Sequence, residues 1–237
     1  MNTMYNTLLE LPFFQGLCNE DLTAILEKVS LNFKDYKENQ VIAQKGSQAN
    51  QLIFIMEGRI KKETHTLNNL LVIEEIIRPP YVIEPQSLFG WSTKLFSEYT
   101  TDTPIKALII SKEALRNELL NYEVFKLNFL NYICYYNQKL NLLQWDLDAQ
   151  DKEEQLISIF WNLSDRNCIK QTIKVKMTDL ADFIGTTRLN VSKILNKWEA
   201  IGLVELSRQE ITIPNPKQLL MHKDLLKRKK GAKTKKE

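Results

Sequence analysis

Short apolar runs broken by turn residues fill the chain from residue 36 to about residue 110. They are "QVIAQKG", "QLIFIMEGRIKKET", "LLVIEEII", "YVIE" and "IKALII", with Gly46 and Gly58 where turns are needed. Runs of this length with regular punctuation predict the strands of a sandwich or barrel. A hairpin loop is expected at residues 67–69 and a break in the strands at residues 78–80.

The pattern then changes to a helical repeat. Ser111 can cap a helix through "KEALRNELL", and a long helix is predicted from about residue 122 to residue 147. The long helix carries a heptad seam formed by Phe129, Ile133, Tyr136, Leu140, Leu143 and Leu147. Such a seam can bury itself against the same helix of a second copy, or it can pack on the chain's own β-domain. We favour dimerisation through the seam, with other faces of the helix on the β-domain.

Residues 178–200 predict two short helices joined by a tight turn, after a helix capped by Asp148 and a strand "IKVKM". Thr178 can cap the first helix, and Gly185 ends it where a positive φ is needed. The first helix is expected to bury Leu180, Phe183 and Ile184. The second starts at Thr186 or Thr187, and its expected buried face is Val191, Ile194, Leu195 and Trp198.

Two short helices at a glycine-containing turn indicate a helix-turn-helix, whose second helix enters the major groove of DNA. Arg188 can pair with guanine, Asn190 with adenine, and Lys193 with guanine or a phosphate. Leu189 lies on the same face, and it is explained if its side chain contacts a thymine methyl group. The alternative is that the whole segment is a small helical core used for protein contacts.

The stretch "GLVELSRQEITI" predicts two short strands after the second helix, so the motif is a winged helix-turn-helix with Arg208 at the wing tip. Small hydroxyl side chains beside the recognition face can donate to phosphate oxygens. The predicted DNA contacts are Thr186, Thr187, Arg188, Leu189, Asn190, Ser192, Lys193, Lys197 and Arg208.

Composition narrows the class of protein. The chain has 237 residues, of which 43% are hydrophobic and 26% charged, as in globular proteins. No apolar run approaches the roughly 20 residues that span a bilayer, and no signal peptide is recognised, so no membrane partner is expected. Cys18, Cys134 and Cys168 are odd in number and far apart, which argues against a disulfide framework and fits the cytoplasm.

Charge is unevenly distributed along the chain. The net charge is +3, yet residues 222–237 hold eight lysines and arginines against two acids. Two interpretations of this tail stay open. It is an arm that touches phosphates, or it is a disordered end that aids solubility.

The order of β-domain, long helix and winged helix-turn-helix resembles the cyclic-AMP receptor protein / fumarate–nitrate regulator (CRP/FNR) family of bacterial transcription factors. The resemblance rests on "YKENQVIAQKGSQANQLIFIMEGRIKK" and "LADFIGTTRLNVSKILNKWEAIGLVEL". It implies an α+β chain with a cupin-like β-roll that resembles cyclic-nucleotide-binding domains. The expected domains are a sensor at 1–120, a dimerisation helix at 121–147, the winged helix-turn-helix at 148–221 and a disordered basic tail at 222–237.

This sequence departs from the family pattern at two places. The family's recognition helix reads Arg-Glu-x-Val-x-Arg, and here Leu189 stands where the glutamate is usual. The nucleotide cassette of the family resembles "EPQSLFGWSTKLFSEYTTDTP", but Trp91 replaces its glutamate and no arginine follows. The expected effector pocket is Leu88, Phe89, Gly90 and Trp91. We therefore disfavour cyclic AMP and leave the effector open. The cysteines for an iron–sulfur cluster are also missing, and we predict no cofactor or metal.

The leading functional interpretation is a homodimeric transcription regulator that binds double-stranded DNA at a pseudo-palindromic operator, with RNA polymerase as a further expected partner. One alternative is a nucleotide sensor that acts through protein contacts. Another is a metal enzyme of the cupin type, which the two histidines of the chain disfavour, since such sites are rich in histidine.

Overall fold

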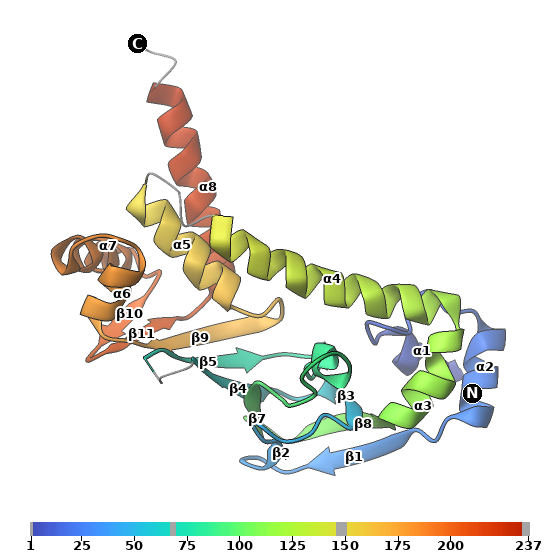
Figure 1. Cartoon of the computed structure of the whole chain (residues 1–237). Helices are drawn as coiled ribbons and strands as arrows, with labels where there is room; N and C mark the ends of the chain where they lie inside the picture. Colours follow the sequence, from blue (N-terminus) through green and yellow to red (C-terminus); the bar gives the residue numbers. More distant parts are fainter. Residues whose placement is uncertain (1, 67–69, 146–150, 234–237) are drawn as a thin grey trace. The chain divides into compact units, whose positions relative to one another are not determined.

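The computed structural model describes residues 2–66, 70–145 and 151–233, and the chain forms two compact units (Figure 1). The first, here called the β-roll unit, comprises residues 1–62 and 77–137. The second, the C-terminal unit, comprises residues 63–76 and 138–237. The predicted loop at 67–69 and the predicted cap Asp148 lie outside the described residues.

The β-roll unit contains β1 Asn32–Tyr36, β2 Val41–Ala43, β3 Gln51–Glu57, the start of β4 Ile60–His65, β6 Tyr81–Val82, β7 Ser97–Thr101 and β8 Ile105–Ser111. Its helices are α1 Asn2–Leu9, α2 Asn19–Lys28, η1 Pro85–Leu88, α3 Lys112–Asn117, η2 Leu119–Asn121 and the part of α4 Glu123–Trp145 up to residue 137. One sheet has the order β1-β8-β3-β6 with antiparallel neighbours, and β2 pairs antiparallel with β7. The α+β fold with a β-roll and a long helix is therefore confirmed.

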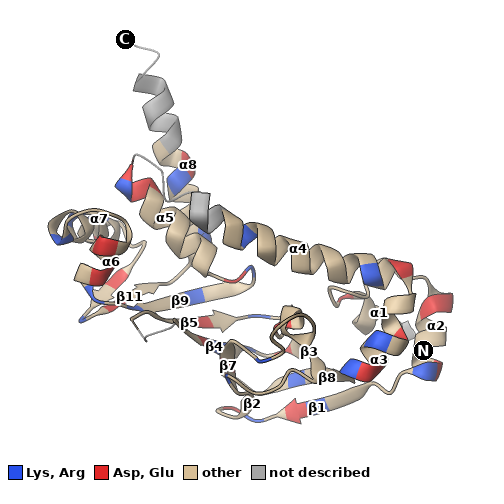
Figure 2. Ribbon diagram, in the orientation of Figure 1, with Lys and Arg blue, Asp and Glu red and all other residues tan. Residues whose placement is uncertain are grey.

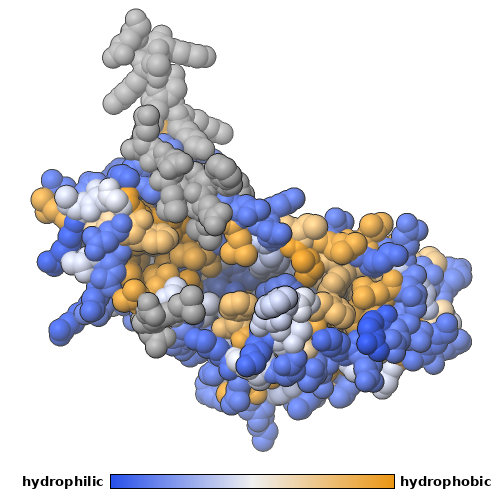
Figure 3. Space-filling model, in the orientation of Figure 1, coloured by the Kyte–Doolittle hydropathy of each residue, from blue (hydrophilic) through white to orange (hydrophobic). Residues whose placement is uncertain are grey.

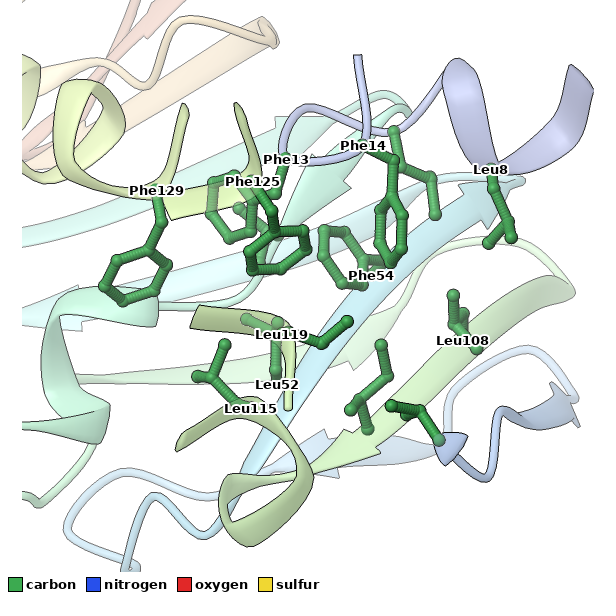
Figure 4. Close-up of a cluster of buried hydrophobic side chains, with 14 of the residues drawn as sticks. Leu8, Phe13, Phe14, Leu52, Phe54, Leu108, Leu115, Leu119, Phe125 and Phe129 are labelled. Carbon is green, nitrogen blue, oxygen red and sulfur yellow. The ribbon is translucent and has the colours of Figure 1, made fainter. Parts of the chain in front are cut away.

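The central strand β3 is apolar on both faces because each face meets a different part of the core. Successive side chains of a strand point to opposite sides. Leu52 and Phe54 join the helices in one cluster, whereas Ile53 and Ile55 face the strands in another. Figure 4 shows the helix-side cluster, in which Phe13 lies with its ring edge-to-face against Phe54. This packing fixes the helices on one side of the sheet.

Two glycines make the expected turns of the β-roll. Gly46 and Gly58 have φ angles of +80° and +83°, a left-handed conformation that side chains disfavour. A Cβ atom at Gly58 would lie 2.2 Å from the carbonyl oxygen of Pro104, whereas a Cβ at Gly46 would meet nothing within 4 Å. The turn at Gly58 thus needs glycine for its conformation and for space.

The first part of the predicted seam of α4 packs within its own unit, and pairing of the seam with a second copy stays a prediction. Phe129 is only 6% exposed in the helix-side cluster, and Ile133 packs against that cluster. Tyr136 stacks on Tyr132 with ring centroids 5.0 Å apart. Leu140 is exposed, the side chain of Leu143 is not among those described, and Leu147 lies outside the described residues. The seam is apolar because the β-roll covers its first half.

The C-terminal unit contains β5 Val72–Ile77, α5 Lys152–Leu163, β9 Cys168–Lys174, α6 Met177–Phe183, α7 Arg188–Ala200, β10 Glu205–Ser207, β11 Glu210–Ile213 and α8 Pro216–Lys233. Its strands follow the order β10-β11-β9-β5-β4. The side chain of Asp151 caps α5 by accepting the amide of Glu153 at 2.8 Å, in place of the predicted Asp148. Trp198 of α7 lies at the centre of the core, with Phe160 of α5 edge-on beside it.

Residues 63–76, which lie within the range expected for the sensor domain, group with the C-terminal unit. The reason is a set of long-range contacts to β9 and its flank. Lys174 forms an ion pair with Glu74, and the buried carboxylate of Glu75 accepts the amide of Asp165. None of these pairs has a signal in the local sequence pattern.

The basic tail also differs from expectation, because α8 extends through residue 233 and so covers most of the segment predicted to be disordered. The helix packs on α5, with Leu219 fully buried and Leu226 partly buried against the core. His222 of α8 lies 3.4 Å from the carboxylate of Glu153 on α5. These contacts order a helix whose lysine content alone suggests a solvated end.

Candidate nucleic-acid interface

The first helix of the motif, α6, begins earlier than predicted and is capped differently. It begins at Met177 after Lys176, and no side chain caps it, while the hydroxyl of Thr178 donates to Asp179 at 3.1 Å. Leu180 and Ile184 are buried as expected. Phe183 is 59% exposed, because Ala181 takes the second buried position on this face. Phe183 was therefore wrongly assigned to the core.

The turn between the helices is closed by backbone hydrogen bonds around Gly185, which has φ +63°. The amide of Thr186 donates to the carbonyl of Ala181 at 3.0 Å, and the amide of Gly185 donates to Asp182 at 3.2 Å. This pair of bonds is the Schellman arrangement that ends a helix at a left-handed glycine. The Lys152 ammonium on α5 also donates to the carbonyl of Ile184 at 2.7 Å. A cation at a helix C-terminus stabilises the exposed carbonyls.

The second helix, α7, starts where the sequence predicted. The hydroxyl oxygen of Thr187 accepts the amide of Asn190 at 3.2 Å, so Thr187 is the N-cap. The predicted apolar face is buried, and its members are Val191, Ile194, Leu195 and Trp198. With one face fixed in the core, the opposite face must point to solvent.

The solvent face of α7 presents the predicted base-reading residues. Leu189 is 66% exposed, and Arg188 and Lys193 are exposed on the same helix. Figure 2 marks the positions of lysines and arginines along the ribbon in blue. Within the described ranges, neither Arg188 nor Lys193 makes a side-chain hydrogen bond or ion pair. Both cations are therefore available to an anionic partner. Ser192 is half-buried on the flank of the helix.

Two of the predicted contacts are tied to each other. The side-chain amide nitrogen of Asn190 donates to the hydroxyl oxygen of Thr186 at 3.0 Å. This bond orients the Asn190 side chain across the first turn of α7 and uses one of its donors. The hydroxyl hydrogen of Thr186 stays free to donate elsewhere.

Lys197 differs from the other predicted contacts, because its ammonium is held within the protein. It donates to both oxygens of Glu153 on α5, at 2.9 and 2.8 Å. The buried indole of Trp198 donates to the same carboxylate at 2.9 Å. Burial raises the pKa of Glu153, but the hydrogen bonds from Lys197, Trp198 and His222 outweigh burial and hold that pKa below its ordinary value. Glu153 thus joins α5, α7 and α8.

The wing is formed by β10 and β11, and Arg208 is exposed in the turn between them, as predicted. The turn contains Gln209 at φ +61°, whose carbonyl accepts the amide of Val175 at 2.9 Å. The amide of Leu206 donates to the Glu199 carboxylate of α7 at 3.1 Å. These bonds attach the wing to β9 and to the recognition helix.

The predicted effector residues of the β-roll lie in different surroundings. Leu88 is buried in the helix-side cluster, Phe89 packs edge-on to Phe129, and Trp91 is fully exposed. A hollow of about 410 Å³ in this unit is lined instead by residues such as Ile42, Gln48 and Ile83. The effector pocket at these residues stays a prediction.

The sequence pattern did not mark three residues that form notable contacts in the structure: Lys152, Glu153 and Glu84. Lys152 and Glu153 hold the ends of the two motif helices, and their partners lie more than thirty residues away along the chain. Glu84 is a buried acid in the β-roll. An isolated acid inside the apolar run "YVIEP" is the one signal that could have marked it.

Across the described residues, no helix is long and apolar enough to cross a membrane. In the same part of the chain, no three histidine, cysteine or acidic side chains gather as a metal site would require.

Residues 154–221 match the family model of the Crp-like helix-turn-helix domain. The fold of the chain is similar to that of a putative transcriptional regulator of the crp/fnr family from Eubacterium rectale, at 15% identity and TM-score 0.51, covering 91% of this chain and 99% of the other. The catabolite activator protein of Thermus thermophilus gives 16% identity and TM-score 0.48, covering 88% and 96%. No curated protein matches the chain. The resemblance to the CRP/FNR family is confirmed by the match of the helix-turn-helix domain, and the first of these structures shows a similar fold.

Proposed function

Because residues 154–221 form a Crp-like helix-turn-helix domain, this chain is a DNA-binding transcription regulator, and we propose that it binds a pseudo-palindromic operator as a homodimer. The observation that carries the proposal is the division of α7 into two faces. Val191, Ile194, Leu195 and Trp198 are buried, while the opposite face is exposed from the first turn onward.

The charged residues of this surface fall into two roles. Arg188 lies in the first turn of α7, where a guanidinium can pair with guanine O6 and N7. Lys193 is placed one and a half turns later, within reach of a guanine or a phosphate. Thr186, Thr187 and Ser192 are proposed to donate to phosphates, as is Arg208 on the wing. Lys197 is proposed to position α7 through Glu153, since its ammonium is already engaged there.

We propose that Leu189 reads a thymine. Leu189 is 66% exposed, and removing its apolar surface from water stabilises the complex. The thymine methyl is the apolar group that the major groove offers for this contact. The Leu189→Glu variant should shift the preference at one base position from thymine toward cytosine, because a carboxylate accepts from cytosine N4. Leu189→Ala should weaken the thymine preference without replacing it. An unchanged preference in both variants refutes this assignment.

The test of the whole proposal is selection of genomic fragments by the purified chain, followed by a salt titration on the best fragment. Arg188→Ala should lower affinity for that fragment by about 5- to 150-fold, mainly through one base position. Lys45→Ala removes one exposed cation from the β-roll unit and serves as the charge-matched control. Sequence-blind binding with a steep salt dependence, equal in both variants, would contradict specific recognition.

The proposed dimer uses the outward face of α4, opposite the buried Phe129. Exposed apolar side chains on this face include Leu127 and Leu130, and Figure 3 shows an apolar band over α4. Cys134 is exposed in the following turn of the same stripe. In a two-fold parallel pair, the two copies of Cys134 approach each other. Mild oxidation of a Cys18→Ser chain should therefore give a disulfide-linked dimer, and a chain that stays monomeric would contradict this face.

No effector is assigned, and cyclic AMP stays disfavoured. Calorimetry with cyclic AMP and cyclic GMP tests this, and low-micromolar binding would overturn it. As a DNA-binding regulator the chain is expected in the cytoplasm, where the bacterial chromosome lies, with RNA polymerase as a further partner.

A further inference from the structure

Glu84 is a buried acid in the β-roll unit that the proposed DNA-binding function does not use. It immediately precedes η1, and only 5% of its surface is exposed. Its backbone adopts φ +31° and ψ +58°, a left-handed conformation that costs free energy for a residue with a side chain. Such a conformation persists only where surrounding contacts compensate for it.

Four donors surround the carboxylate of Glu84. One oxygen, Oε1, accepts the amide of Ser97 at 2.8 Å and the hydroxyl of Tyr99 at 3.1 Å. The other, Oε2, accepts the amide of Phe96 at 2.8 Å and the hydroxyl of Ser87 at 3.0 Å. Both oxygens are therefore doubly hydrogen-bonded, with two donors from consecutive backbone amides.

All four partners of Glu84 in the described chain are neutral. A negative charge that is removed from water is costly unless hydrogen bonds replace its hydration. Converging amides and hydroxyls do replace it, and such arrangements bind carboxylates and phosphates in many proteins. The donors lie on η1, on β7 and at Phe96 directly before β7, so the pocket is shaped for an anionic group independently of where that group comes from.

We propose that this arrangement is an anion-binding site that the β-roll fills with its own carboxylate. Glu84 acts as an internal ligand that connects η1 to the start of β7. An external carboxylate or phosphate cannot enter while Glu84 is in place. The class of ligand that fits after removal of the side chain is a small carboxylate.

The test uses chemical rescue of the full-length chain. Glu84→Ala removes a methylene and a carboxylate, which together have the size and charge of an acetate ion. Thermal unfolding of this variant is compared in sodium acetate and in sodium chloride of the same ionic strength. A site with a dissociation constant of about 10 mM would raise Tm by about 3–6 °C at about 0.1 M acetate. The wild-type chain, whose site is occupied, should show no difference between the two salts.

Glu84→Gln is the matched control, because glutamine keeps the side-chain volume of Glu84. Its amide NH₂ would replace one carboxylate oxygen and would face groups of the pocket that also donate. It should be less stable than the wild type and should not respond to acetate. If Glu84→Ala does not fold in chloride, a cooperative transition should be recovered in acetate. The proposal is overturned if acetate fails to stabilise or fold Glu84→Ala, or if it stabilises all three chains equally.

Discussion

Glu153 offers the sharpest test of how the DNA-binding surface is supported. Its carboxylate accepts hydrogen bonds from Lys197 and Trp198 of α7 and lies 3.4 Å from His222 of α8. We predict that Glu153→Ala loosens the recognition helix although no predicted DNA-reading side chain is changed. Glu153→Gln keeps an oxygen that can accept from the indole, so it removes the charge but preserves one hydrogen bond.

The magnitude follows from the burial of each partner. Trp198 is fully buried, and leaving its N–H without an acceptor costs about 1–3 kcal/mol. The side chain of Lys197 is 53% exposed, so its ion pair adds about 1 kcal/mol or less. We expect the free energy of unfolding to fall by about 1–4 kcal/mol in Glu153→Ala and by about 1 kcal/mol or less in Glu153→Gln.

The assay is urea unfolding followed by far-UV circular dichroism at several pH values. The pKa of Glu153 lies below its ordinary value of 4.5 in the folded chain. A group of this kind stabilises the fold above its unfolded pKa and loses that contribution as pH falls through the folded pKa. The stability difference between wild type and Glu153→Gln should therefore be constant near neutral pH and should shrink below about pH 4.5.

Asp182→Asn is the control, since Asp182 is an exposed acid of α6 whose side chain has no hydrogen-bond partner in the described part of the chain. It should change stability by less than about 0.5 kcal/mol. The reasoning is refuted if Glu153→Ala is no less stable than Asp182→Asn. A wild-type advantage over Glu153→Gln that grows as the solution is acidified would refute the assigned direction of the pKa shift.

Three further outcomes are expected. Gly58→Ala should lower the free energy of unfolding by about 2–4 kcal/mol, because its Cβ would clash with a carbonyl oxygen. Gly46→Ala should lower it by only about 1–2 kcal/mol, through its positive φ alone. Equal urea midpoints for the two variants would contradict this. Thr187→Ala should cost about 1 kcal/mol through loss of the α7 cap, and Thr187→Ser should restore it in thermal unfolding. Burial, with nearby acids, raises the pKa of the Cys168 thiol. Mass spectrometry after alkylation near neutral pH should therefore find Cys168 unlabelled, while the two exposed cysteines react. Rapid labelling of Cys168 would contradict its burial.

The helix-turn-helix could be predicted because its determinants act over a few residues. The positive φ of Gly185, the cap at Thr187 and the buried face around Trp198 all follow from local conformation and helical spacing. The same holds for the turns of the β-roll, where glycine relieves a local strain. The exposure of Leu189 also follows, since its position opposite a buried face leaves no other place for it.

The tertiary structure alone decided which partner each apolar or charged group meets. The sequence marks α4 as apolar on more than one side, but only the packed β-roll shows that Phe129 is covered within the unit and Leu127 is not. Likewise Glu84 and Glu153 are ordinary acids in the sequence. Apart from Ser87, the hydrogen-bond donors of Glu84 lie 12 or more residues away along the chain. Those of Glu153 lie 44 or more residues away. Periodicity is set by neighbours along the chain, whereas burial and hydrogen bonding are set by neighbours in space.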